Sequence, residues 1–204
     1  MLIGFKRLKV QVFDEEGAPS GEPIVIEGKQ DKGATQEATI SGLSAEPTKI
    51  YGSNVAYYVS QRGTGEVKVA FTLFDVPDDA EGKMLGYTVD EALKAQFIGE
   101  STEPPYCAIL LESEDAKGNT AAFGFFKGKF SAGDVALKTK EGGGYTPNSQ
   151  SYTFSPVTSD WADKSKGSTM VKFLGSESER AAIEALVFHK PTGGGVNVAS
   201  VSKA

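Results

Sequence analysis

Apolar residues recur at every second position in several segments of this chain, and this period restricts the fold class more than any other feature. The clearest example is "EVKVAFTLFDVP", which begins at Glu66. Its larger apolar residues Val67, Val69, Phe71 and Leu73 fall on one face, and the residues between them are mostly polar. Side chains alternate between the two faces of a β-strand, so this pattern predicts a half-buried strand of an antiparallel sheet.

Further segments predict more strands of the same sheet. "YCAILLE", residues 106–112, is apolar on both faces, as is typical of a central strand. Turn-forming residues separate it from the next apolar segment at 120, so we expect a hairpin there. "DVALKTK", residues 134–140, and "SYTFSPV", residues 151–157, also alternate. The chain is therefore expected to be mainly β.

The segment "AAFGFFKGKF", residues 121–130, combines aromatic residues with glycines. Strict alternation places Phe123 and Phe125 on the face opposite Phe126 and Phe130. Glycine inside a strand often marks a bulge, a bend or a close approach of backbone. We expect one of these irregularities at the two interleaved glycines.

Helices are predicted at two places only. In "VPDDAEGKMLGY" Pro77 stands near the start, acidic residues fill the first turn, and Gly86 follows the end. In "SESERAAIEALVFHKP" Ser176 and Glu179 have the spacing of a capping box. The segment from Thr88 to Ala95 stays ambiguous, because a capping pair could also start a short helical turn there.

The polar stretch "GKQDKGATQEATISGLSAEP", residues 28–47, is unusual for a compact domain. Its only large aliphatic residues are Ile40 and Leu43. Read as a strand, "GATQEATIS" alternates between a polar face and a face of small, weakly apolar residues. A long ribbon with so little core is marginal in water unless its backbone pairs with a neighbour. We therefore predict that this ribbon finds its hydrogen-bonding partners in another copy of the chain and is mobile in the free monomer.

Composition excludes several classes of function. The net charge of −6 does not favour direct binding to nucleic acid or membrane, which basic patches support. The longest apolar run, residues 107–111, is far below the roughly 20 residues of a membrane helix. The start "MLIGFKRLKV" lacks the features of a signal peptide. The single cysteine, Cys107, excludes an internal disulfide, so we expect assembly in a reducing cytoplasm.

Catalytic chemistry finds little support in the residue types. The single histidine, His189, cannot form a histidine-rich metal site, and Cys107 lies in a strand that is expected to be buried. Carboxylates cluster at 75–81 and at 112–115, and two of them at a suitable separation could hydrolyse a glycoside. Both clusters, however, stand at a helix start and at a turn, where solvated acids are common.

Exposed aromatic residues leave a second alternative open. The pair Tyr57 and Tyr58, or the lone Trp161, could stack on sugar rings. The chain could then be a β-sandwich carbohydrate-binding or adhesin module, which predicts a stable monomer.

Long strings of this sequence resemble the major tail proteins, or tail tube proteins, of long-tailed non-contractile phages of Gram-positive bacteria. The strings are "VIEGKQDKGATQEATISGLSAEPTKIYGSNVAYYVSQRGTGEVKVAFTLFDVPDDAEGKMLGY", "PPYCAILLESED" and "AAFGFFKGKFS". The resemblance covers residues 3–158 and extends more loosely to the helix near 172–189. It implies a β-sandwich or barrel with a flanking helix, a long extended hairpin or loop at about 27–51, and a short C-terminal helix. The tail-tube domain would span residues 1–189, followed by a flexible tail at 190–204.

The resemblance also implies the function. Six subunits would form a ring, and stacked rings would form the tube through which DNA leaves the virion without sequence-specific binding. Partners would be copies of the chain and other tail proteins such as the tape measure, tip and terminator, assembled in the host cytoplasm. No enzymatic activity, cofactor, metal or membrane is implied.

Within the predicted ribbon we expect six residues to take part in assembly or to line the lumen. Glu37 is the candidate for an acid that repels DNA phosphates. The set is Gln30, Thr35, Glu37, Thr39, Ser41 and Leu43.

Overall fold

The computed structural model describes residues 1–137, 139 and 148–190. Within that part the chain is mainly β, as the alternation predicts, with two helices. The strands are β1 (Leu2–Val12), β2 (Ile24–Ile26), β3 (Ala34–Ser41), β4 (Thr48–Gly52), β5 (Val55–Ser60), β6 (Lys68–Phe74), β7 (Thr88–Asp90), β8 (Ala95–Phe97), β9 (Cys107–Asp115), β10 (Thr120–Ala132), β11 (Ser149–Val157) and β12 (Met170–Gly175). The helices are α1 (Asp78–Leu85) and α2 (Glu177–Val187).

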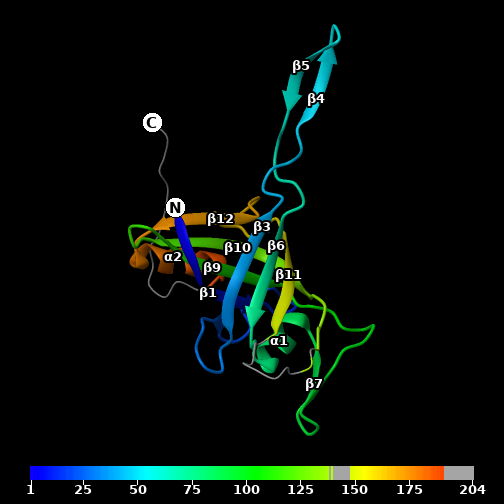
Figure 1. Cartoon of the computed structure of the whole chain (residues 1–204), viewed down its shortest axis with the longest axis vertical. Coiled ribbons are helices and arrows are strands. Elements are labelled where there is room, and N and C mark those ends of the chain that lie inside the picture. The colour runs from blue at the N-terminus through cyan, green and yellow to red at the C-terminus, as the bar shows by residue number, and fades with distance from the viewer. Residues whose placement is uncertain (138, 140–147, 191–204) are drawn as a thin grey trace.

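Eight of these strands form one strongly curved antiparallel sheet (Figure 1). Its order is β2-β1-β9-β10-β11-β6-β3, with β12 pairing β10 beside this path. The sheet curls until β3 approaches β1, where the Thr35 hydroxyl donates a hydrogen bond of 2.6 Å to the Phe5 carbonyl. No strand pairing between β3 and β1 closes the described sheet, so it stops short of a barrel.

Strand β10 joins the two halves of the curl. Its first part pairs with β9 and β12, and its second part pairs with β11. The pairing with β9 shifts register between Phe125 and Gly128, which is the bulge that the glycines indicate. The bulge reverses the alternation after it, so Phe130 packs in the same core as Phe125, and the prediction that it lies opposite is wrong.

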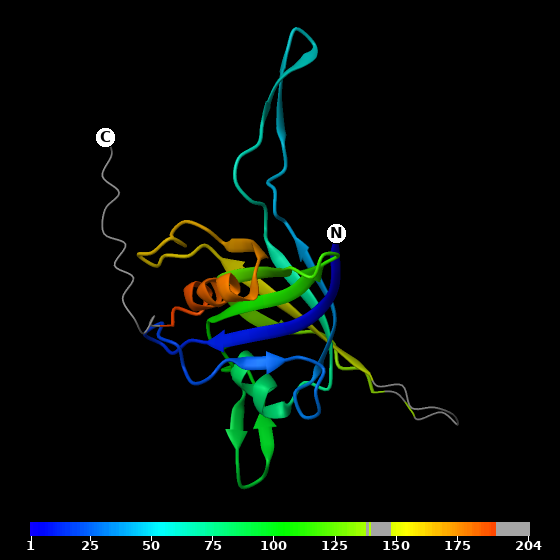
Figure 2. The ribbon, with the colours of Figure 1, turned by 90° about the vertical axis from the view of Figure 1, so that its left-hand side faces the viewer.

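Two clusters of apolar side chains form the interior. The larger lies inside the curl, and its residues come from β1, β2, β6, α1, β9, β10 and β11. The smaller lies on the outer side of β9 and β10, under α2. Figure 2 shows α2 lying across this outer side. The helix packs closely because Gly124 has no side chain; a Cβ there would come 2.5 Å from Val187 Cγ2.

The predicted helix ends are confirmed. Pro77 precedes α1, and Gly86 ends it in the left-handed conformation, with its backbone close to the Glu103 carbonyl. Ser176 and Glu179 form the capping box of α2.

The structure settles one ambiguity and corrects one expectation. The segment from Thr88 to Ala95, left ambiguous by the sequence, is not helical, because β7 and β8 pair there as a small two-stranded hairpin. Residues 134–137, part of a predicted strand, form no regular secondary structure. The predicted tail at 190–204 lies, apart from Lys190, outside the described residues.

Candidate assembly surfaces

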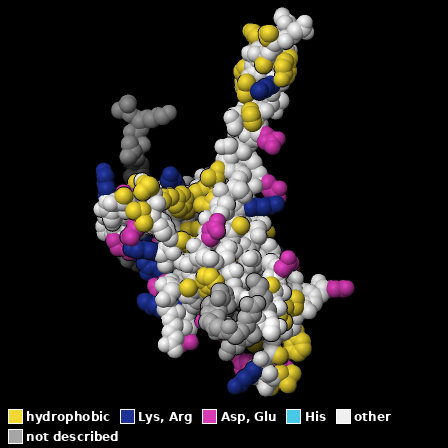
Figure 3. All heavy atoms as spheres, in the orientation of Figure 1, with side chains coloured by type: hydrophobic (Ala, Val, Ile, Leu, Met, Phe, Trp, Pro, Cys, Tyr) yellow, Lys and Arg dark blue, Asp and Glu magenta, His cyan; other side chains and the backbone are white. Residues whose placement is uncertain are grey.

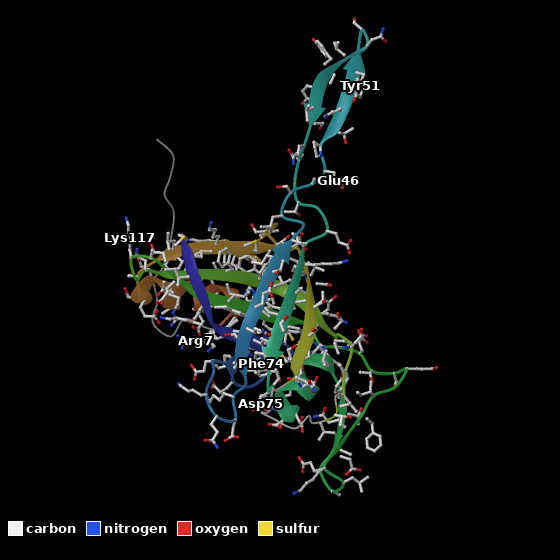
Figure 4. The ribbon with its side chains drawn as sticks, in the orientation of Figure 1. Arg7, Glu46, Tyr51, Phe74, Asp75 and Lys117 are labelled. Atoms are coloured by element: carbon white, nitrogen blue, oxygen red, sulfur yellow. The ribbon has the colours of Figure 1, made fainter. Side chains whose placement is uncertain are left out.

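The strands β4 and β5 form a hairpin, Thr48–Ser60, that stands away from the body of the molecule; we call it the arm (Figure 1). Among the described strands, the two pair only with each other. Their tip, Ser53 and Asn54, has positive φ at both residues, as a tight hairpin turn requires. Figure 4 places Tyr51 on the arm, far from Phe74 and Asp75 on the body.

The arm is apolar but buries almost nothing. Its large apolar side chains are all at least half exposed, and Tyr57 reaches 83%. Neighbouring residues along β5 point to opposite faces, so both faces of the arm present apolar surface. The exposed set is Ile50, Tyr51, Val55, Tyr57, Tyr58 and Val59. Contiguous exposed apolar surface of this kind marks a site of interaction with another molecule.

Backbone contacts fix the root of the arm. Gly65 N–H donates to the Gly42 carbonyl at 2.9 Å, and Ala45 N–H donates to the Gly63 carbonyl at 3.2 Å. Gly42 has φ +73°, and a Cβ there would lie 2.0 Å from the Glu66 carbonyl oxygen. Only glycine fits this crossing, which sets the direction in which the arm leaves the body.

Below the arm, four strand segments present one polar outer face, which we call the hydroxyl face. Aligned across β3, β6, β11 and β10 are Thr39, Ala70, Thr153 and Ser131. The next aligned positions toward the lower end of β3 are Glu37, Thr72 and Ser151. In Figure 3 this region is largely white, the colour of side chains that are neither charged nor apolar.

The hydroxyl face exposes few acids, although the net charge of the chain is −6. All residues of its strand segments are described, and Glu37 is the single acid that they expose outward. The outer lysines pair with acids that lie off these segments: Lys68 with Glu66, Lys127 with Asp160 and Lys129 with Glu103. The negative charges of the chain therefore do not concentrate on this face.

The structure separates the six predicted assembly residues. Glu37, Thr39 and Ser41 share the hydroxyl face, whereas Thr35 bonds inward to Phe5. Gln30 lies in the turn between β2 and β3, and Leu43 lies at the root of the arm.

Strand β3 also corrects the prediction about backbone pairing. Its inner edge pairs with β6 of the same chain from Ala34 to Ser41. The backbone groups on this edge therefore have hydrogen-bonding partners within one chain. Its outer edge carries no strand pairing within the described residues. An unpaired edge of this kind is a template for strand addition.

A buried ion-pair cluster attaches α2 to the sheet. Glu112 on β9 is almost fully buried and contacts Arg7 at 2.7 Å, Lys9 at 3.3 Å and Arg180 at 2.8 Å. Glu184 on α2 contacts Lys9 at 2.6 Å and also pairs with Arg180. Burial alone would raise the pKa of Glu184, but the bonds from Lys9 and Arg180 outweigh it and lower that pKa. Glu112, which belongs to the predicted carboxylate cluster at 112–115, therefore has a structural role.

Other residues that were considered for catalysis or sugar binding also pack or form hydrogen bonds within the fold. Cys107 is buried, and burial raises the pKa of its thiol to about 12, which leaves it protonated and unreactive. Trp161 stacks on His189 with ring centroids 3.9 Å apart and also touches Phe13, so its ring is not free as a sugar platform. In the other acid cluster, Glu81 accepts a hydrogen bond of 2.8 Å from the Tyr152 hydroxyl.

The described residues contain no group of three or more histidine, cysteine, aspartate or glutamate side chains that could hold a metal ion. The helices of the described part are too short or too polar to cross a membrane.

The fold and these surfaces define a structural subunit: a curled β body with an apolar arm, a polar sheet face and an open sheet edge. Residues 8–188 match the family model described as "Phage tail tube protein", and the chain belongs to that family. Comparison with curated proteins gave no match.

The exposed apolar surface of the arm was not predicted from the sequence. The predicted hairpin or loop at about 27–51 ends where the arm begins its turn. The signal was present: "TKIY" and "VAYYVS" are strand-like runs on either side of a Gly-Ser-Asn turn, residues 52–54.

Proposed function

We propose that this chain assembles with copies of itself into hexameric rings, which stack into the tail tube of a long-tailed non-contractile phage. The observation that carries the proposal is the arm, which exposes six large apolar side chains that no part of the described chain covers. Burying one such side chain contributes roughly 1.5–3 kcal/mol, so several of them can offset the entropy lost on association.

The hydroxyl face is the surface that best suits the lumen. Hydroxyl groups are neutral, so they neither attract nor repel DNA phosphates strongly, and Glu37 adds a modest repulsion. DNA would then pass during ejection without being bound at any particular sequence. The open edge of β3 lies beside this face and offers backbone groups for pairing with the next subunit around the ring.

The location and partners of the protein follow from this role. The subunit is made and assembled in the cytoplasm of a host, proposed to be Gram-positive, and ends in the virion tail. There it contacts other tail proteins such as the tape measure, the tip and the terminator. The tube itself needs no catalysis.

Negative-stain electron microscopy of concentrated protein, with and without preformed tail tips as seeds, tests the proposal. Rings or tubes of uniform diameter are expected. Protein that stays monomeric in both conditions contradicts it. Monomers that also bind glycans would support the carbohydrate-binding module, for which Tyr57 and Tyr58 remain exposed.

A further inference from the structure

A second exposed apolar patch lies at the end of the molecule opposite the arm. The β7–β8 hairpin, residues 88–97, projects from the body below α1; we call it the lower hairpin (Figures 1 and 2). Its exposed apolar residues, together with the residue that follows it, are Val89, Leu93, Phe97 and Ile98. Like the arm, this two-stranded sheet pairs with no other described strand, and an isolated hairpin is marginally stable in water.

The two patches cannot cover each other within one chain. Both views place the arm and the lower hairpin at opposite ends of the long axis, with the body between them. Figure 3 shows apolar side chains gathered on the arm and at the lower end of the molecule, with further groups on the body. Pairing one of these apolar patches with another between copies allows three arrangements: arm against arm, lower hairpin against lower hairpin, or arm against the lower hairpin of another copy.

Symmetry separates these possibilities. Contacts between identical patches are isologous and close into dimers. A contact between two different patches at opposite ends is heterologous, and repeating it adds copies along one direction without limit. Only the second kind can extend a tube.

Charge favours the same pairing. The arm carries one charged residue, Lys49, so arm against arm would bring like charges together. Residues 88–100 carry three acids, Asp90, Glu91 and Glu100, against one base, Lys94. A net positive arm therefore meets a net negative lower hairpin, whereas two lower hairpins would repel each other.

We infer that the arm of each subunit docks on the lower hairpin of a copy in the adjoining ring, so that this contact sets the stacking of the tube. The inference rests on the proposed function and adds to it the identity of the docking surface. It gives the lower hairpin a role as the receiving half of the joint.

Cross-linking through introduced cysteines can test this contact. The native Cys107 is buried and its thiol is protonated, so it should not react with the reagent. The variants Tyr57→Cys and Ile98→Cys are assembled into tubes together and treated with a short bis-maleimide reagent. Covalent dimers are expected from the mixture, and ladders of multimers are expected from a chain that carries both substitutions. Ser131→Cys on the hydroxyl face, combined with Tyr57→Cys, is the matched control and should stay uncross-linked.

The outcomes separate the docking surface from the proposed function. Tubes that form but give no Tyr57→Cys to Ile98→Cys product overturn the docking surface and leave the tube role intact. Dimers from Tyr57→Cys alone favour arm against arm and also overturn it. Wild-type protein that never forms rings or tubes overturns the proposed function and the docking surface with it.

A second pair of variants covers the case in which the thiols disturb assembly. Phe97→Ser should abolish tube formation as strongly as Tyr57→Ser, while both keep the monomer's unfolding midpoint, because both side chains are exposed. Normal tubes from Phe97→Ser would overturn the inference.

Discussion

At the scale of single residues, Gly42 has the most specific role. Gly42→Ala brings a Cβ to 2.0 Å from the Glu66 carbonyl oxygen and also strains a backbone with φ +73°. Gly63→Ala has a similar φ, +80°, but nothing within 4 Å, so it isolates the strain alone, about 1–2 kcal/mol. We expect urea unfolding to show a clearly larger loss for Gly42→Ala. Equal losses would mean that the crossing at the root of the arm is not tight.

Two glutamates on β9 give a second comparison between residues. Glu112→Gln removes the charge that faces Arg7, Lys9 and Arg180 in a buried cluster, and breaking such a cluster typically costs about 3–5 kcal/mol. Glu114→Gln removes only the exposed pair with Lys6, where about 0–1 kcal/mol is expected. Chemical denaturation measures both, and similar losses would argue against the structural role of the cluster.

His189 should make the stability of the fold sensitive to mild acid. Burial lowers the pKa of His189 below the usual value for histidine, against the opposing attraction of Asp163 and Asp160. The unfolded chain therefore binds the proton more readily, and stability falls as pH drops from about 6.5 toward the folded pKa. Unfolding free energies measured between pH 7.5 and 5.5 should show this decline in the wild type. His189→Asn should show a flatter profile, and parallel profiles would contradict the prediction.

At the scale of elements, local sequence patterns predict most of the body. The strand with Val69 and Phe71, the buried strand after Tyr106 and the capped helix after Ser176 all follow from periodicity and capping chemistry. An error arises where one residue changes the period, because the bulge before Gly128 moves Phe130 to the other face. The segment 88–95 stayed ambiguous because its capping pair allows a helical turn, and the structure has a hairpin there with a turn at 91–94. Pairing of β3 with β6 depends on contacts between segments, which periodicity does not report.

The candidate surfaces were harder to predict from the sequence than the strands and helices of the body. Low apolar content singles out residues 28–47 in the sequence, yet the arm at 48–60 is where six large apolar side chains are at least half exposed. An apolar strand usually indicates burial, but no part of the described chain covers the arm. Composition of one chain cannot tell a core strand from a strand that is covered only in an assembly.

The two edges of β3 should behave differently in solution. Amides of 34–41 that point to β6 are paired in the single subunit, and those that point outward are not. Hydrogen exchange of free subunits should therefore protect about half of these amides, in alternation. Assembly should protect the rest. Full protection in the free subunit, or no gain on assembly, would count against strand addition at this edge.

At the scale of the whole molecule, the arm, the hydroxyl face and the lower hairpin follow one another along the long axis (Figure 1). In the proposed tube, the two end patches of different composition would direct growth, and the polar side face would be left for the DNA. A second copy would then cover the arm, whose exposed apolar surface favours aggregation of the free subunit.

The same arrangement predicts how charge on the hydroxyl face affects DNA. Glu37→Lys replaces one negative charge by one positive charge in each subunit, a net change of +2 on a face that exposes Glu37 as its single acid, and the change repeats in every copy. Because lysines neutralise phosphates and release counterions, DNA should leave assembled tails more slowly, and the delay should shrink as salt rises. Glu22→Lys makes the same change of charge in the exposed loop before β2 and is the matched control. Fluorescent-dye measurement of ejection separates position from net charge. Equal kinetics for both variants in intact tails would place the hydroxyl face on the outside of the tube.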